Sequence, residues 1–183
     1  MGIAQSDSET QHCWVVQNKG LLFTDENTPI LLYGESSGGN LATAALLYNE
    51  NANVQGNILV YPSLDYYQPY PSKKEFAKGY LLDEDVRLWL ACNYLNNENE
   101  RKNTLVSLIL SDRLRVLPRT LIISAHFDPL RDEAQAFYQE LIKNGVSAHL
   151  TEFDTIHGFI SMQIEPYCKM ANDQIIGFIN SVR

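Results

Sequence analysis

The chain has 183 residues, a length that suits a single domain spanning residues 1–183. Its formal net charge is -8, and this acidic balance argues against nucleic acid or an anionic membrane surface as a partner. The cysteines, Cys13, Cys92 and Cys168, are odd in number and widely spaced, so we expect reduced thiols and a cytoplasmic protein. No apolar stretch is long enough to span a membrane, and no group of metal ligands stands out.

Four strands are predicted along the chain. Continuous apolar runs occupy 29–33, 57–61 and 120–125, and such runs are typical of parallel strands that are covered on both faces. A more polar run at 148–153 suits the edge of a sheet.

Helices are predicted between these strands and after them. They cover about 41–47, 83–95, 129–144 and 166–182, and the last one is expected to face inward with Ile175, Ile176 and Phe178. The alternation predicts an α/β fold with a mainly parallel sheet of about four strands, flanked by helices.

A G-x-S-x-G motif, Gly34 to Gly38, stands between the run at 29–33 and the helix at 41–47. In this strand-turn-helix context the central Ser36 is predicted to be a nucleophile on a strained turn, for which the flanking glycines leave room. The alternative is that this Gly/Ser-rich segment is only a turn.

A serine nucleophile needs a base, and the base needs an orienting group. His157 is the preferred base because it follows the last strand across a short loop, whereas His126, close to a strand end, stays open as a second candidate; His12 and His149 are expected to have no catalytic role. Asp128 follows the strand at 120–125, and open α/β sheets place their sites at this end of their strands. It could also be the N-cap of the helix that follows, and the two roles are not exclusive.

Several motifs in this order resemble the hormone-sensitive lipase-like α/β-hydrolases, the carboxylesterase and lipase family. Residues 34–42 resemble their GDSAGGNLA block, 61–65 their YPxLD segment, 128–133 their DPLRDE block and 157–159 their HGF. The resemblance implies an α/β-hydrolase fold and ester hydrolysis with Ser36, Asp128 and His157 as nucleophile, acid and base, without a cofactor. Glu35 and Ser37 replace the usual aspartate and alanine.

One feature of that family is missing from the sequence. Its members carry an HGGG segment upstream of the serine, whose amides supply most of the oxyanion hole, but here Gly38-Gly39 is the only glycine pair. The backbone N–H of Ser37 is the remaining expected donor. The resemblance therefore implies an N-terminally truncated hydrolase domain.

Residues 63–118 form a long insertion between two predicted strands, and an insertion of this length is usually functional. In the resembling family it contributes to a cap over the acyl pocket. That comparison makes Tyr66 and Tyr67 candidate substrate-binding residues. The alternative is that the tyrosines of this segment only bury it against the core.

The sequence therefore predicts hydrolysis of a small-molecule ester through an acyl-enzyme, with short acyl chains preferred. The alternative is a catalytically silent binding or interaction module of the same fold. In the resembling fold an earlier strand flanks the one at 29–33, so we expect an exposed edge there. A second copy, a rearranged N-terminal segment or a companion polypeptide is expected to cover it.

Overall fold

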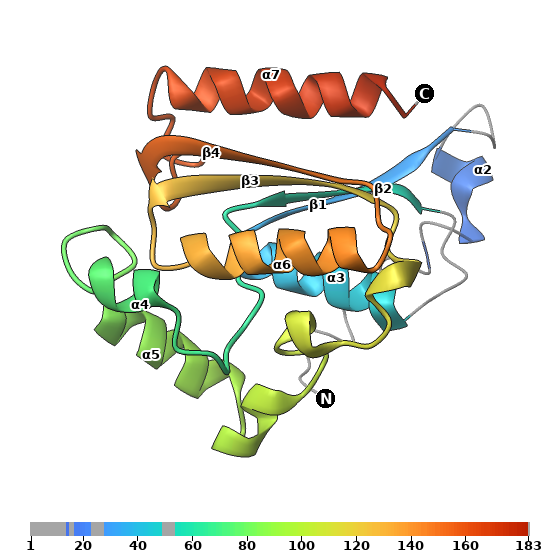
Figure 1. The fold of residues 1–183 in the computed structure, drawn as a ribbon. Helices are drawn as coiled ribbons and strands as arrows, with labels where there is room; N and C mark the ends of the chain where they lie inside the picture. The colour runs from blue at the N-terminus through green and yellow to red at the C-terminus, as the bar shows by residue number, and fades with distance from the viewer. Residues whose placement is uncertain (1–13, 15–16, 23–27, 49–53, 183) are drawn as a thin grey trace.

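The computed structural model describes residues 14, 17–22, 28–48 and 54–182. Four parallel strands lie side by side in chain order at its centre (Figure 1): β1 (Ile30–Glu35), β2 (Val54–Val60), β3 (Arg119–Phe127) and β4 (Ala148–Ile156). All four predicted strands are present, and β4 lies at an edge as its polar composition indicates.

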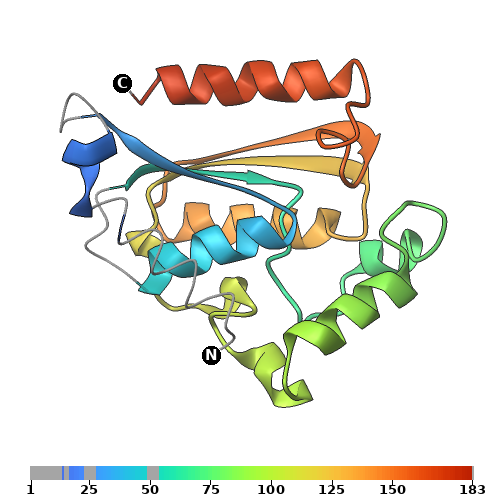
Figure 2. The same cartoon turned by 180° about the vertical axis from the view of Figure 1, so that it is seen from behind.

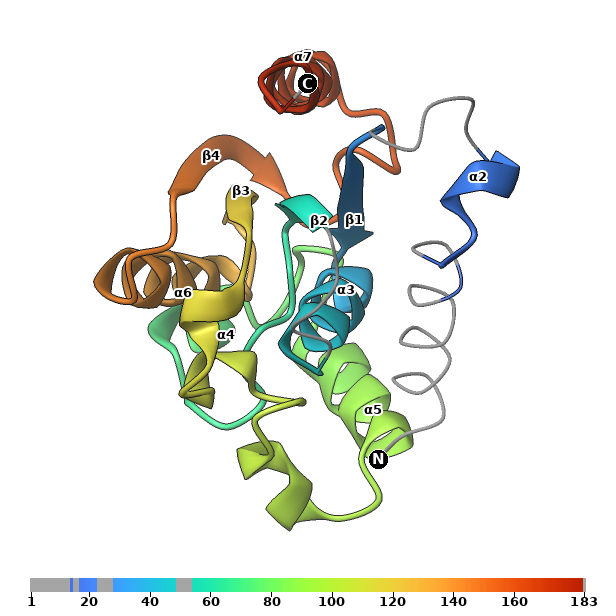
Figure 3. The same ribbon diagram turned by 90° about the vertical axis from the view of Figure 1, so that its right-hand side faces the viewer.

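Helices cover both faces of this sheet. α3 (Ser37–Tyr48) and α6 (Arg131–Lys143) lie on one face, and α7 (Tyr167–Asn180) lies on the other (Figures 1 and 3). Seen from behind, α3 crosses beneath β1 and β2 (Figure 2). A short helix, α2 (Lys19–Leu22), precedes β1.

Apolar side chains fill both interfaces of the sheet. Neighbouring residues of one strand point to opposite faces, so Leu59 and Ile122 pack under α3 and α6 while Ile58 and Ile123 pack under α7. Both faces are therefore buried, and this explains why the strands are continuous apolar runs rather than alternating ones.

The inward face of α7 differs in part from the predicted one. Ile175 is buried and Phe178 packs against the core, but Ile176 is 55% exposed, so its inward placement is wrong. The buried positions Cys168, Ala171 and Ile175 follow the three-to-four-residue spacing of one helical face. A side chain one position further is turned by about 100° and points to solvent.

The insertion between β2 and β3 has two parts with different environments. Its helices are α4 (Pro71–Glu75) and α5 (Glu84–Tyr94), which lie beyond the layer of α3 and α6 (Figure 1), and the short 3₁₀ helices η1 (Glu98–Lys102), η2 (Leu108–Leu110) and η3 (Leu114–Val116). Leu108 and Leu114 are fully buried in the core under α3 and α6. The later part of the insertion thus belongs to the domain core, and the part with α4 and α5 forms the candidate cap.

Candidate active site

Ser36 lies on a sharp turn between β1 and α3. Its φ is +52°, a left-handed conformation that costs a non-glycine residue about 1–3 kcal/mol and occurs mainly at functional sites. Three backbone hydrogen bonds hold it: its N–H donates to Val60 at 2.9 Å, and its carbonyl accepts from Gly39 and Ser63 at 3.1 Å each. The strained turn is therefore fixed to the chain that leaves β2.

The glycines around this turn have different roles. A Cβ on Gly34 would lie 2.2 Å from the carbonyl oxygen of Gly38, so no side chain fits there. A Cβ on Gly38 would meet nothing within 4 Å, and the steric reason predicted for this glycine is wrong. The second crowded position is Gly39, where a Cβ would lie 2.8 Å from Cβ of Pro62. Gly39 is crowded because it lies on the side of α3 that faces the chain leaving β2.

Ser36, His157 and Asp128 are joined by two hydrogen bonds. His157 Nε2 lies 3.0 Å from Ser36 Oγ, and His157 Nδ1 lies 2.7 Å from Asp128 Oδ2. Asp128 is 1% exposed and His157 is 7% exposed. With an ionised Asp128, the imidazole carries its proton on Nδ1 and leaves Nε2 free to accept from the serine.

Asp128 also stabilises the turn before α6. Its Oδ1 accepts from the backbone N–H of Leu130 at 2.8 Å, while Leu130 itself occupies the N-cap position of α6. The predicted N-cap role of Asp128 is therefore wrong, because Leu130 occupies that position. One carboxylate oxygen holds the turn, and the other faces the imidazole.

The remaining histidines of the described structure have other partners. His126 Nδ1 lies 2.8 Å from Glu152 Oε1, and His149 Nε2 lies 3.3 Å from Thr151 Oγ1. His12 lies outside the described residues. Of the two candidate bases, His126 and His157, it is His157 that contacts both Ser36 and Asp128.

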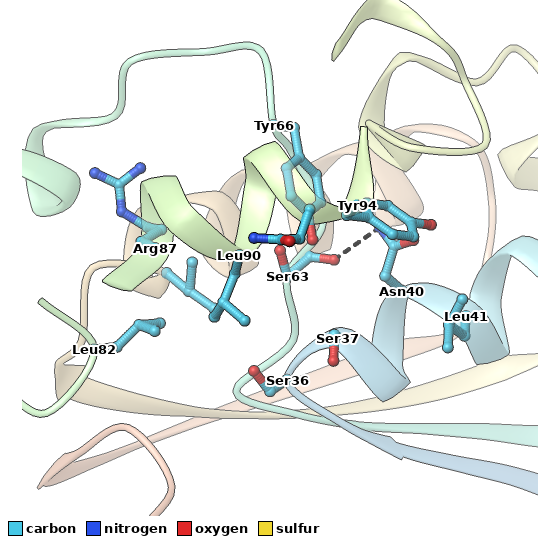
Figure 4. Close-up of a pocket in the computed structure, with 12 residues that line it drawn as sticks. Ser36, Ser37, Asn40, Leu41, Ser63, Tyr66, Leu82, Arg87, Leu90 and Tyr94 are labelled. Carbon is cyan, nitrogen blue, oxygen red and sulfur yellow. Dashed lines mark hydrogen bonds between the residues drawn. The ribbon is translucent and has the colours of Figure 1, made fainter. Parts of the chain in front are cut away.

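A pocket of about 350 Å³ opens at Ser36 (Figure 4). α3 contributes Ser37, Asn40 and Leu41 to its lining, and α5 contributes Arg87, Leu90, Asn93 and Tyr94. The α5 residues were not predicted individually. Their three-to-four-residue spacing on one helical face is the sequence signal that could have identified them.

The two candidate tyrosines are placed differently. Tyr66 lines the pocket, and burial raises the pKa of its phenol, which keeps it neutral. Tyr67 does not belong to the lining: it is 43% exposed, and the Lys102 ammonium lies 4.9 Å from its ring centroid. Its N–H donates to Asp65 Oδ1 at 2.7 Å in a turn, which sends successive side chains in different directions.

Asn40, one of the lining residues, connects three segments of the chain. Its Nδ2 donates to the carbonyl of Ser63 at 3.0 Å, drawn in Figure 4, and to that of Val106 at 2.8 Å. These bonds fix α3 to the start of the insertion and to the segment before η2. The side chain is 1% exposed, so the two bonds form in a setting with little competing water.

Ser37, the predicted oxyanion donor, is the first residue of α3. The N–H groups of a first helical turn have no intrahelical acceptor and lie at the positive end of the helix dipole. An anion forming at Ser36 would therefore meet a favourable field.

Two further findings concern the described part of the chain alone. It contains no group of three or more His, Cys, Asp or Glu side chains placed to hold a metal ion. Within it, no helix has the length and apolar character needed to cross a membrane.

A family model described as alpha/beta hydrolase fold matches residues 2–161. The chain therefore belongs to the α/β-hydrolase fold family, within its hormone-sensitive lipase-like branch.

Curated relatives and solved structures agree with this assignment. The chain is 30% identical over 136 residues to an arylesterase of Saccharolobus solfataricus, covering 73% of this chain and 44% of the relative. It superimposes on the thermostable carboxylesterase EstE1, cloned from a metagenomic library, with a TM-score of 0.91 and 27% identity, covering 97% of this chain and 63% of that one. An esterase of Pyrobaculum calidifontis gives a TM-score of 0.91 at 29% identity, over 97% of this chain and 60% of that one. The chain thus spans about half the length of the curated relatives that it matches.

Proposed function

We propose that the chain carries the catalytic centre of a serine carboxylesterase. The observation that supports this most is the pair of hydrogen bonds that joins Ser36 to His157 and His157 to Asp128, at 3.0 and 2.7 Å. Nucleophile, base and orienting acid are then all within hydrogen-bonding reach, and the serine sits on a strained turn that exposes its oxygen.

The reaction begins when Ser36 Oγ attacks the ester carbonyl carbon and His157 Nε2 takes its proton. The imidazolium then protonates the alkoxide as the ester C–O bond breaks, and the alcohol leaves. A water molecule, deprotonated by His157, then attacks the acyl carbon. The imidazolium returns that proton to Ser36 Oγ as the bond between Oγ and the acyl carbon breaks, and a carboxylic acid leaves. Asp128 holds the imidazole in the required tautomer throughout and stabilises its charged form.

We infer a preference for short acyl chains from the volume of the pocket. At about 350 Å³ it lies at the small end of ligand pockets. The outer surface gives no further reason for this preference, because the apolar side chains Leu88 and Trp89 of α5 are exposed. The preference therefore depends on the pocket alone.

A second candidate function follows from the oxyanion hole. The sequence contains no HGGG segment, and removing even one oxyanion donor typically costs about 10²–10³ in turnover. With Ser37 as the identified donor, the chain could bind an apolar ligand in the pocket without turning it over. That would make it a silent binding module of the same fold.

Hydrolysis of nitrophenyl acetate, butyrate and palmitate distinguishes these functions. The esterase proposal predicts turnover that is abolished in Ser36→Ala, with acetate and butyrate preferred over palmitate. The matched control is Ser111→Ala, a substitution outside the pocket lining. If the parent chain turns over these esters no faster than Ser36→Ala does, the silent binding module is favoured. Preferential cleavage of the palmitate ester would contradict the short-chain preference.

A further inference from the structure

Glu35, the residue before Ser36, carries a carboxylate that the reaction above does not use. It accepts hydrogen bonds from the hydroxyls of Tyr33, Tyr61 and Ser161, with Tyr61 Oη at 2.6 Å. These donors belong to β1, to the chain leaving β2 and to the loop that follows His157. One side chain therefore ties the serine turn to the loop that carries the base.

Tyr61 brings this cluster into contact with the base. Its ring centroid lies 4.8 Å from that of His157 and 5.5 Å from that of Phe159, which is fully buried. Its backbone has a φ of +36°, and its N–H donates to Ile123 at 2.6 Å. The ring thus lies between the Glu35 carboxylate, which holds its hydroxyl, and the imidazole, against which it packs.

The Glu35 carboxylate is charged at neutral pH. Burial raises the pKa of this carboxyl, but the hydrogen bonds from Ser161, Tyr33 and Tyr61, together with the nearby His157, outweigh burial and hold the pKa below its ordinary value. Burial and the Glu35 hydrogen bond raise the pKa of the Tyr61 phenol to about 12, so it stays a donor. Burial and the hydrogen bond to Glu35 raise the pKa of the Tyr33 phenol as well.

We propose that Glu35 is a positioning residue for the base of this site. It fixes the loop after His157 through Ser161, and its negative charge, together with that of Asp128, favours the imidazolium that forms when Ser36 loses its proton. This inference rests on the proposed hydrolase function, because it assigns a role in the same proton transfer. The acidic residue next to the nucleophile would then serve the mechanism rather than only the turn.

Length and charge of the side chain make separate contributions in this proposal. Glu35→Gln preserves length and removes the charge, whereas Glu35→Asp preserves the charge and shortens the reach to Tyr61 and Ser161. Ser161→Ala removes one hydrogen bond from an exposed loop residue and leaves the charge in place. Glu140→Gln is the matched control, since Glu140 pairs with Lys143 near the end of α6 that leads to the amino end of β4.

The test measures how fast a fluorophosphonate probe labels Ser36 as a function of pH, with all variants compared at temperatures well below their melting points. We expect the probe to label Glu35→Gln about tenfold more slowly than the parent chain. In the plot of labelling rate against pH, the rise at low pH should lie about half to one pH unit lower in Glu35→Gln, because an imidazolium without this charge gives up its proton more readily. Glu35→Asp and Ser161→Ala should also be labelled more slowly, but their labelling rate should rise at the same pH as in the parent chain. Glu140→Gln should match the parent chain.

A parallel histidine ¹⁵N NMR titration needs no reaction and therefore separates the two proposals. Absence of labelling in the parent chain would contradict the proposed function. A lower titration midpoint of the His157 ring in Glu35→Gln would still support the electrostatic role of Glu35. If Glu35→Gln leaves that midpoint where it is in the parent chain, the role assigned to Glu35 is wrong.

Discussion

At the scale of single residues, the two motif glycines that flank Ser36, Gly34 and Gly38, differ in the space around them. Gly34 faces the carbonyl of Gly38 across the turn, whereas Gly38 faces open space. In the G-x-S-x-G motif the two glycines are equivalent members. The difference arises from the direction in which α3 leaves the turn, and a motif by itself does not encode that direction.

Gly34→Ala and Gly38→Ala form a matched pair that tests this difference. We expect Gly34→Ala to lower the free energy of unfolding by about 3 kcal/mol or more, since a contact of 2.2 Å with backbone forces the strained turn to move. Gly38→Ala should be neutral or stabilise by up to about 1 kcal/mol, because the site is open, helical and without positive φ. Urea denaturation of both variants measures the difference, and equal losses would contradict the geometric account.

At the scale of elements, a buried ion pair attaches the candidate cap to the core. Glu133 of α6 is fully buried and accepts from the backbone N–H of Leu64 at 2.7 Å, while the Lys73 ammonium of α4 lies 2.7 Å from its other oxygen. Burial raises the pKa of the Glu133 carboxyl, and Lys73 opposes that shift. The pair fixes α4 and the start of the insertion, where Ser63 and Tyr66 line the pocket.

Lys73→Met should therefore be costly. It leaves the buried carboxylate without its cation, and breaking a buried pair in this way typically costs about 3–5 kcal/mol. Lys74→Met is the control, because Lys74 is the exposed neighbour on the same helix. Chemical denaturation should show a large loss for Lys73→Met and almost none for Lys74→Met; similar small losses would mean that the pair does not secure the cap.

The elements were predictable from sequence because apolar runs and helix punctuation are local signals. The strands at 29–33, 57–61, 120–125 and 148–153 all exist, and so does the helix that begins after Asp128. The differences at Tyr67 and Ile176 concern which way a side chain points, and the one at Gly38 concerns the space around a backbone position. The hydrogen bonds around Glu35 could not be predicted from the sequence, because Ser161 lies 126 residues from Glu35 and no local sequence pattern indicates that the two are in contact.

At the scale of the whole molecule, β1 leaves one edge of the sheet open among the described residues. It pairs with β2 on one side, and within residues 14, 17–22, 28–48 and 54–182 no strand pairs with its other side. Leu31 and Leu32 are half-buried there, and Tyr33 is 46% exposed. The predicted open edge is confirmed for this part of the chain, and what covers it stays a prediction.

We predict that a second copy, the N-terminal segment or a companion polypeptide pairs with this edge, and that the chain otherwise aggregates. Light scattering at micromolar concentration is the measurement. Leu32→Lys should reduce association, because charged residues on an edge strand oppose pairing. A monodisperse monomer whose β1 amides exchange freely with solvent would contradict the prediction.

The central claim is that this fold assembles an activated serine at Ser36, and active-site labelling tests it most directly. After incubation of the folded chain with a fluorophosphonate, peptide mass spectrometry should find one adduct, on Ser36, formed as the serine oxygen replaces fluoride at phosphorus. Labelling should fall by several orders of magnitude in His157→Ala and vanish in Ser36→Ala. A folded chain that stays unlabelled, or an adduct that persists in Ser36→Ala, would contradict the account.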